Sequence, residues 1–419
     1  MTSGPVWHPF TQHALQPDAI SIARAAGAWL EATDGRRILD AISSWWVVTH
    51  GHRHPRIIDA IKKQADALDQ VIFAGFTHDP AEELAARLTQ RIGLPHAFFS
   101  DSGSTAVEVA LKMALGFWRN QGINRTRIIA LEHAYHGDTI GTMSAGARGI
   151  FNAPYDPLLF DVIRLPFPNR GDEDKTLTAL KAATADGRAA ALIVEPLILG
   201  AGGMLTYAPE TLRAMAAICQ QSQTLFIADE VMTGFGRTGT LLACHQAGIT
   251  PDILCLAKGI TGGSLPLAVT LASTSIFEAH YSEDRRKTFF HSSSYTANPI
   301  ACAAAVANLN VWDQEPVQER ITQIAQWQRE MSEGLQTNPR FSDMRLCGTI
   351  AAFDLRVADE GYLASIGPKL YDYFLSRGLL LRPLGNTIYI MPPYCITRDE
   401  LSRIYDAIRD AADHFGARI

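Results

Sequence analysis

Two ionisable residues end apolar segments in the second half of the chain. Lys258 closes the run 252–257 and precedes a glycine-rich turn, and Asp229 follows the apolar run 224–228. An amine at the mouth of a buried strand can hold phosphate or form a Schiff base, and a carboxylate opposite it can hold the proton of a ring nitrogen. Pyridoxal phosphate (PLP) requires this pair of groups. The two residues therefore predict a PLP enzyme, most simply an aminotransferase.

The carboxylate of Asp229 needs a cationic partner, because burying an unpaired carboxylate is costly. A protonated pyridine nitrogen is one such partner. A metal ion is the alternative, but residues 231–233 offer no second ligand at a useful spacing. The histidines at positions 50, 52 and 54 also resemble a metal cluster, yet no cysteine or carboxylate lies near them in the sequence. We expect no bound metal.

A small-residue turn follows the candidate strand 97–100. Gly103 and Ser104 open a helix there, and the unpaired N–H groups of a helix start suit a phosphate. An ordinary helix cap without a ligand is the plainer interpretation. The turn predicts a phosphate site only in combination with Asp229 and Lys258.

Further polar and aromatic residues follow two other candidate strands. Tyr135 comes after the strand ending at residue 131 and could stack on a planar ring, and Asp138 could steady a neighbouring hydroxyl or amide. Glu195 directly follows the strand 190–194. A loop with a packed tyrosine is the alternative, so the prediction of a site rests on the location at strand ends.

The run 234–239 (Gly-Phe-Gly-Arg-Thr-Gly) spells a dinucleotide-binding pattern without its context. That fingerprint turns from a strand directly into a long helix, and here the chain soon reaches Gly248. Arg237 is expected to order this loop or to brace an acidic group such as Glu195. Arg382 lies between two late apolar runs, where its guanidinium would bind a substrate carboxylate or form a surface salt bridge.

Short apolar segments alternate with amphipathic ones between residues 80 and 300. Strands that are apolar on both faces and separated by helices indicate a largely parallel sheet, covered on each side. The candidate strands are 97–100, 127–131, 190–194, 225–228, 253–256 and 267–271. Ligands of such sheets gather at the carboxyl ends of the strands. Ser102, Glu195, Asp229 and Lys258 all occupy those ends, which predicts one shared site.

Both ends of the chain show a different pattern. Residues 20–45 suggest a short antiparallel unit with Asp34-Gly35 at its turn. Beyond residue 305, helical segments at 303–312 and 316–335 are followed by a mixture of strands and helices. We predict an α/β fold with a large cofactor-binding domain at 51–306 and a small α+β domain formed by residues 1–50 and 307–419.

Composition narrows the class of protein. At 419 residues the chain is too long for one ordinary core, and its net charge of −6 gives no reason to expect nucleic acid or an acidic membrane as a partner. The 6 cysteines are scattered without a C-x-x-C pair, as is typical of reduced thiols. The first residues show neither a basic start nor an apolar stretch, and no run of about 18 apolar residues occurs. We expect a cytoplasmic protein without a signal peptide or membrane span.

These segments resemble the class III aminotransferases of fold type I over nearly the whole chain. The matching stretches are WHPFTQ (7–12), SSWW (43–46), DSGS (101–104), YHGDT (135–139), GAGGM (200–204), DEVMTGFGRTG (229–239), DILCLAKGITGG (252–263) and RPLGNTIYIMPPY (382–394). Four of them, WHPFTQ, SSWW, DSGS and YHGDT, are more specific than the general aminotransferase pattern. They are similar to the branch of the family that aminates 8-amino-7-oxononanoate in biotin synthesis.

The resemblance implies a role for each site residue. It makes Lys258 the Schiff-base lysine, Asp229 the partner of the ring nitrogen and Tyr135 the cover of the ring. The other cofactor-binding residues that it implies are Gly103, Ser104, Asp138, Glu195, Ser293 and Ser294. The substrate-binding residues that it implies are Phe10, Trp45, Trp46, Tyr135, Ser292 and Arg382. The family sends residues at 292–294 across a dimer interface to the neighbour's phosphate, so a homodimer with two active sites is implied.

The chain departs from some members of the family. They carry tyrosine where this chain has Phe10, and Gly-Pro-Thr where this chain has three serines at 292–294; a serine hydroxyl can still donate to phosphate. Related enzymes use lysine rather than S-adenosylmethionine as the amino donor. The tryptophans at 45 and 46 favour the sulfonium donor, since aromatic faces attract cations.

Several alternatives fit parts of the pattern. A broader ω-aminotransferase acting on diamines or ω-amino acids would keep the same cofactor residues, and an aminomutase or decarboxylase would share the fold and the lysine. A ligand-sensing or scaffold protein would not require the intact pair Asp229 and Lys258, and a dehydrogenase would need the helix that the run 234–239 lacks. The prediction is transamination of 8-amino-7-oxononanoate with PLP as cofactor and S-adenosylmethionine as donor.

Overall fold

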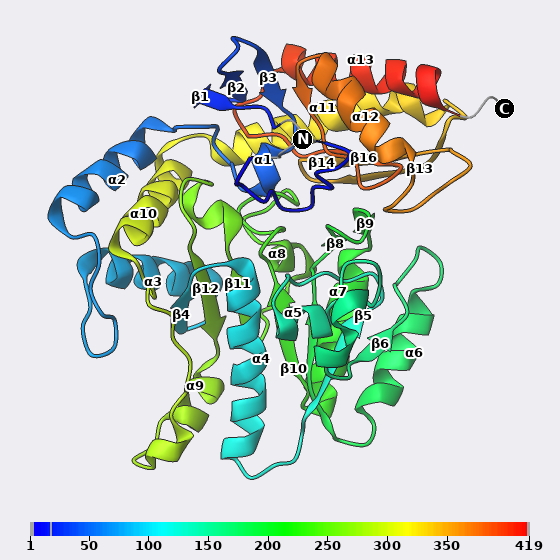
Figure 1. The fold of residues 1–419 in the computed structure, drawn as a ribbon. Coiled ribbons are helices and arrows are strands. Elements are labelled where there is room, and N and C mark those ends of the chain that lie inside the picture. The colour runs from blue at the N-terminus through cyan, green and yellow to red at the C-terminus, as the bar shows by residue number, and fades with distance from the viewer. Residues whose placement is uncertain (1–3, 17–18, 417–419) are drawn as a thin grey trace.

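The computed structural model describes residues 4–16 and 19–416. It shows a large central sheet with its helices, and above it a smaller layer of helices and short sheets (Figure 1). Residues 1–3, 17–18 and 417–419, which belong to the terminal segments of the predicted small domain, lie outside the described residues. The two layers meet at the edge of the central sheet where its parallel strands have their carboxyl ends. The candidate site lies at this junction.

The central sheet has the strand order β4-β12-β11-β10-β7-β5-β6. β12 is antiparallel to both of its neighbours, and the other neighbouring pairs are parallel. The strands are β4 (His96–Ser100), β5 (Arg127–Leu131), β6 (Ile163–Leu165), β7 (Ala189–Val194), β10 (Leu225–Asp229), β11 (Ile253–Leu256) and β12 (Ala268–Ala272). The predicted, largely parallel sheet is confirmed. β6 is absent from the prediction because three residues are too few to show a period.

Alternate residues of the strands face opposite cores, because strand side chains point alternately to the two sides of a sheet. Ile128 and Ile193 pack with one set of helices, whereas Ile129 and Leu192 pack with the other. The first set is α4 (Gly103–Asn120), α5 (Ile140–Ala145) and α9 (Thr274–His280), and the second is α3 (Asp79–Ile92), α6 (Glu173–Thr184), α7 (Pro209–Ser222), α8 (Ala243–Ala247) and α10 (Pro299–Gln314). Both faces are therefore buried, which explains why the strands lack polar alternation.

Residues from both ends of the chain form the upper layer. β3 (Arg37–Asp40) runs parallel to β15 (Leu379–Leu380) in a sheet of order β1-β2-β3-β15. β1 (Ile22–Ala26), β2 (Trp29–Ala32) and β3 pair antiparallel, with the turn between β2 and β3 at the predicted Asp34-Gly35. Figure 1 shows these blue strands beside the red C-terminal helix α13 (Arg398–Phe415). The predicted association of the chain ends is confirmed, whereas the boundaries at residues 50 and 306 stay a prediction.

The rest of the upper layer joins that sheet in one core. Leu39 and Ile42 belong to the same buried cluster as Phe353 and Ile404. The remaining elements of this layer are α1 (Ser43–Trp46), α11 (Val317–Gln336), α12 (Ile366–Ser376), β8 (Ile198–Leu199), β9 (Leu205–Thr206), β13 (Phe341–Cys347), β14 (Ile350–Leu355) and β16 (Thr387–Ile390). By contrast, α2 (Pro55–Ala67) packs against α10, where Ile57 meets Ala304 and Ala307. Within the described ranges, no helix has the length and apolar character needed to cross a membrane.

Candidate active site

A cavity of about 400 Å³ lies where the carboxyl ends of the central strands meet the upper layer. Its floor, defined here as the strand-end residues, consists of Ser102–Ser104, Tyr135–Asp138, Glu195, Asp229 and Lys258. Its mouth consists of side chains from loops and from both chain ends: Phe10, Trp45, Phe151, Tyr362 and Arg382. Trp46 lies between floor and mouth. All predicted site residues line this cavity except the serines at 292–294.

Lys258 is separated from the end of β11 by Ala257 and is the first residue of a short 3-10 turn that runs to Thr261. Its φ of 47° is in the left-handed region. Burial lowers the pKa of its amine to about 8, although the carboxylates of Asp229 and Glu195 act in the opposite direction. Its Nζ lies 4.6 Å from the centre of the Trp46 ring, and the described residues hold it in no ion pair. The amine therefore faces the cavity, and a larger fraction of it is neutral near pH 7 than of an exposed lysine.

Asp229, at the end of β10, is bonded through both carboxylate oxygens. Oδ2 lies 2.7 Å from Nδ1 of His136, and Oδ1 accepts the backbone N–H of Val231 at 3.1 Å. The His136 side chain is fully buried, and its Nε2 finds no partner among the described residues. His136 is missing from the predicted site although it directly follows Tyr135. The sequence motif suggested no chemical role for His136, and only the fold brings its side chain to Asp229.

The start of α4 forms one wall of the floor. Ser102 caps the helix by accepting the N–H of Thr105 at 3.2 Å, and the N–H groups of Gly103 and Ser104 have no partner within the helix. The hydroxyl of Ser104 accepts the N–H of Asp138 at 3.2 Å, which joins α4 to the loop after β5. Gly137 (φ 132°) permits this approach, because a Cβ there would lie 2.1 Å from that hydroxyl oxygen. The wall fits an anion such as a phosphate.

Glu195 follows β7 and connects two loops of the floor. Its Oε1 accepts the N–H of Tyr135 and its Oε2 that of Gly200, both at 2.9 Å. Burial raises the pKa of this carboxyl to about 7. Burial also raises the pKa of the Tyr135 phenol far above its usual value, with a further contribution from the Asp138 carboxylate. Tyr135 is therefore a neutral ring at physiological pH and suited to lie against a planar ligand.

Arg382 ties the N-terminal segment to the mouth. Its Nη2 donates to the carbonyl oxygen of Phe10 at 2.9 Å, and its guanidinium carbon lies 5.2 Å from the centre of the Trp45 ring. The rings of Phe10 and Trp45 are 5.7 Å apart and are 46% and 41% exposed. In the described part of the chain Arg382 forms no ion pair, so the guanidinium faces the cavity instead of a surface carboxylate.

Two aromatic residues of the mouth are missing from the predicted site. The rings of Phe151 and Tyr362 lie 4.4 Å apart, and the Phe151 ring lies 6.4 Å from that of Tyr135. They come from loops after α5 and β14. Neither loop follows a strand of the central sheet, so the strand-end argument did not mark either of them as part of a site.

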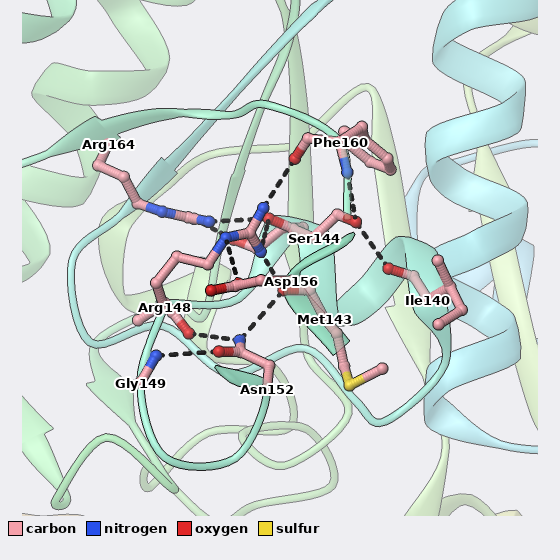
Figure 2. Close-up of polar contacts among 11 residues, drawn as sticks. Ile140, Met143, Ser144, Arg148, Gly149, Asn152, Asp156, Phe160 and Arg164 are labelled. Carbon is pink, nitrogen blue, oxygen red and sulfur yellow. Dashed lines mark hydrogen bonds and ion pairs between the residues drawn. The ribbon is translucent and has the colours of Figure 1, made fainter. Parts of the chain in front are cut away.

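The loop that carries Phe151 is anchored on the last turn of α5 (Figure 2). Arg148 donates to the carbonyl oxygens of Met143 at 3.1 Å and Phe160 at 2.9 Å, and Arg164 donates to that of Ser144 at 2.8 Å. Carbonyl groups at a helix C-terminus lack partners within the helix and attract cations. Burial and the neighbouring Arg148 lower the pKa of Arg164 to about 10. Two adjacent arginines thus hold one wall of the mouth in place.

Arg237 does not brace Glu195, and that part of the prediction is wrong. Its buried guanidinium donates to the carbonyl oxygens of Pro392 at 2.9 Å and Val48 at 3.0 Å. Glu195 is satisfied by backbone N–H groups and needs no cation. These bonds tie the loop of Arg237 to segments from both chain ends, which agrees with the other predicted role, that of ordering this loop. The run 234–239 forms turns rather than the start of a helix, as expected.

The three histidines at positions 50, 52 and 54 bond to three different side chains and do not converge on one point. The pairs are His50 with Asn308 at 2.8 Å, His52 with Asp40 at 2.8 Å and His54 with Glu315 at 3.1 Å. Asn308 in turn donates to the carbonyl oxygens of Gly259 and Ile260, at 3.1 and 2.9 Å. His50 therefore supports the turn that follows Lys258.

The serines at 292–294 do not line the cavity of their own chain. Ser292 and Ser294 are exposed, and the carbonyl oxygen of Ser294 accepts Nε2 of Gln70 at 2.7 Å. Their contact with a neighbouring subunit's phosphate stays a prediction.

The fold and the cavity define a class of enzyme. A strand-end lysine, a buried aspartate and a helix N-terminus meet in one cavity, in an α/β protein with a mostly parallel central sheet. The family model described as Aminotransferase class-III matches residues 11–412, and the chain belongs to that family.

The chain is similar over nearly its whole length to proteins named adenosylmethionine-8-amino-7-oxononanoate aminotransferase. It is 49% identical to that of Synechococcus elongatus over 97% of this chain and 98% of the relative, and 38% identical to that of Geobacter sulfurreducens over 96% and 94%. The crystal structure of the Methanocaldococcus jannaschii protein of this name has a TM-score of 0.94 at 33% identity, over 99% and 98% of the two chains. A PLP-bound amine transaminase from an uncultivated Pseudomonas species has a TM-score of 0.93 at 32% identity, over 99% and 100%. Family membership and this PLP-bound structure support PLP as the cofactor.

Proposed function

We propose that this chain catalyses the PLP-dependent transfer of an amino group to 8-amino-7-oxononanoate, giving 7,8-diaminononanoate for biotin synthesis, with S-adenosylmethionine as the donor. One observation carries the proposal: Lys258, the Asp229–His136 pair and the start of α4 share a cavity, in a chain 49% identical to a relative named for this acceptor. The bound cofactor would supply an electron sink for the carbon that loses a proton.

Residues of the floor would hold the cofactor and move the proton. Asp229 would hold the proton of the ring nitrogen, and His136 would fix the orientation of its carboxylate. Gly103 and Ser104 would bind the phosphate through N–H and hydroxyl groups at the start of α4. Lys258 would move the proton between the substrate carbon that bears the nitrogen and the cofactor. An amine with a pKa of about 8 can both accept and donate a proton near neutral pH.

The remaining floor residues would shape the cofactor site. Tyr135 would cover the ring, Asp138 would steady the loop beside the phosphate through its N–H bond to Ser104, and Glu195 would hold the backbone of Tyr135. The contacts of Asp138 and Glu195 support these assignments.

Residues of the mouth would bind two unlike substrates in turn. Arg382 would bind the carboxylate of the oxononanoate with its guanidinium fork, in exchange for the carbonyl of Phe10. The aromatic faces of Trp45 and Trp46 suit the sulfonium cation of the donor. Flat apolar walls tolerate both ligands, which a cavity shaped to one of them would not.

We also propose that the protein is a cytoplasmic homodimer. Ser293 and Ser294 of each subunit would reach the neighbour's phosphate, and Ser292 the neighbour's substrate. The exposed position of this segment away from its own cavity supports the arrangement.

The test is an amino-transfer assay with purified protein. The oxononanoate is offered with S-adenosylmethionine, lysine or alanine, and product is quantified for the wild type and for Lys258→Ala. We expect product with S-adenosylmethionine, and neither product nor the visible absorbance of the lysine-bound cofactor in the variant. Full activity of Lys258→Ala would exclude the proposed mechanism, and transfer from lysine alone would replace the proposed donor.

A broader ω-aminotransferase is the second candidate. The similarity to the amine transaminase structure favours it, because that protein shares the fold over the same length. Rapid amino transfer from simple diamines to pyruvate, with none to the oxononanoate, would establish this alternative.

A further inference from the structure

The segment that carries the two cavity tryptophans has an unusual backbone. Ser43, Ser44 and Trp46 have φ angles of 53°, 61° and 69°, all in the left-handed region that residues with a side chain rarely adopt. None of the three is a glycine, so the surrounding contacts must hold this conformation.

Asp40, at the end of β3, provides those contacts from one side. Its side chain is fully buried, and its two oxygens accept the N–H of Ser44 at 2.8 and 2.7 Å, the hydroxyl of Ser44 at 3.1 Å and the N–H of Ile42 at 3.3 Å. Nε2 of His52 lies 2.8 Å from Oδ2. His52 is itself fixed, because its backbone N–H and C=O both bond to Gly27.

The opposite side of the segment leads to the reactive amine. Ser43 donates its hydroxyl to the carbonyl of Met391 at 2.8 Å, and Nε1 of Trp46 donates to the hydroxyl of Tyr389 at 3.0 Å. The Trp46 ring then lies 4.6 Å from Nζ of Lys258. An aromatic face at this distance attracts an ammonium group.

We propose that Asp40, supported by His52, is a positioning residue for the transfer reaction: it holds the left-handed turn so that the face of Trp46 lies against the amine of Lys258. The inference rests on the proposed role of Lys258. Asp40 touches neither the cavity nor the amine and acts through Trp46. Its carboxylate is suited to this task because it accepts several N–H and O–H groups that the turn leaves without backbone partners.

The decisive experiment is a double-mutant cycle of Asp40→Asn and Trp46→Phe, with Asp34→Asn as the matched control. Asp34 is an exposed aspartate at the β2–β3 turn, bonded only locally to Arg36. We expect Asp40→Asn to lower kcat on the order of tenfold with a smaller change in KM, and the control to match the wild type. If Asp40 acts through Trp46, the loss caused by Asp40→Asn shrinks to about twofold or less in the Trp46→Phe background. Independent, multiplicative losses would overturn the inference.

A measurement on the cofactor-free protein provides a readout other than activity. An amine-reactive reagent modifies Lys258 in its neutral form, and peptide mapping gives the pH of half-maximal modification. A displaced or weaker aromatic face stabilises the ammonium form less, so Asp40→Asn and Trp46→Phe should each lower this pH by about half a unit. The other groups acting on the amine, Asp229, Glu195 and Arg237, are unchanged in both variants. An unshifted profile in both would contradict the inference.

Milder variants cover the case in which Asp40→Asn does not fold. Ser44→Ala removes one hydroxyl bond to Asp40, and His52→Gln keeps a donor towards it. Both should lower kcat less than Asp40→Asn, and in the same direction. Inactivity of the wild type towards every donor would count against the proposed function, whereas an active wild type with unchanged variants would count only against the role of Asp40.

Discussion

The floor and the mouth of the cavity differ in how they are built. Floor residues such as Asp229 and Glu195 are 4% and 5% exposed and bonded through both carboxylate oxygens. Mouth residues such as Phe10 and Trp45 are 46% and 41% exposed and held mainly by ring contacts and one arginine. Polar networks in a buried site are sensitive to every partner, whereas half-exposed aromatic contacts tolerate change.

This difference suggests that the floor determines the reaction and the mouth determines which substrate binds. The floor comes from strand ends of one sheet, so its geometry follows from the fold that class III aminotransferases share. The mouth comes from both chain ends and two long loops, which can vary without moving the sheet. Substitutions in the floor should therefore act on kcat, and those in the mouth on KM.

The largest effect is expected at Asp229. Asp229→Asn should lower kcat at least about a hundredfold, because an amide cannot hold the proton of the ring nitrogen. Steady-state kinetics would measure the loss. Asp252→Asn is the matched control, an aspartate at the opposite end of the neighbouring strand that accepts a backbone N–H from Phe226, and it should keep kcat. Equal losses in both variants would mean that the floor acts only through folding.

The next largest effect is expected in the rate of PLP capture, because the pKa of Lys258 is lowered. Its pKa of about 8 lies well below the ordinary value of 10.5, and only the neutral amine reacts. The rate at which cofactor-free protein captures PLP should therefore rise with pH and reach half its maximum near pH 8. At neutral pH the rate should exceed that of an exposed lysine on the order of a hundredfold. Absorbance stopped-flow across pH 6–10 measures this, and a midpoint above pH 10 would show that burial does not tune the amine.

A smaller effect is expected at the mouth. Arg382→Lys should raise KM for the oxononanoate about tenfold and change kcat little, because lysine cannot offer two parallel N–H bonds to a carboxylate. The cofactor absorbance should stay that of the wild type. A fall in kcat with unchanged KM would place Arg382 functionally with the floor and weaken the distinction.

The smallest effect is expected in the loop that carries Phe151. Arg148→Gln should raise KM roughly twofold to fivefold, since Arg164 still binds the end of α5. Arg127→Gln removes an exposed pair with Asp186 and should leave the kinetics unchanged. If the two variants behave alike, the anchored loop does not shape substrate binding.

The same division explains which site residues could be predicted. Lys258, Asp229, Glu195 and the start of α4 follow apolar strands, and parallel strands bring their carboxyl ends to one edge. Phe10, Trp45 and Trp46 came from the family resemblance, whereas Arg382 was first marked by its place between two late apolar runs. The structure brings all four to the cavity. His136, Phe151 and Tyr362 had no signal of their own, because their role depends on neighbours far away in the sequence.

The sequence by itself determined the class of chemistry. Apolar runs that end in an amine, a carboxylate and a small-residue turn are compatible with few folds and few cofactors, since the apolar character of a run and the residue that ends it are both local properties of the sequence. Tertiary structure alone decided that His136 contacts Asp229 and that Asp40 accepts hydrogen bonds from the segment before Trp46. It also decided that Arg237 donates to carbonyl oxygens and not to Glu195. Most of those contacts join segments distant in sequence, and no local pattern records which side chain a buried polar group will meet once the layers close.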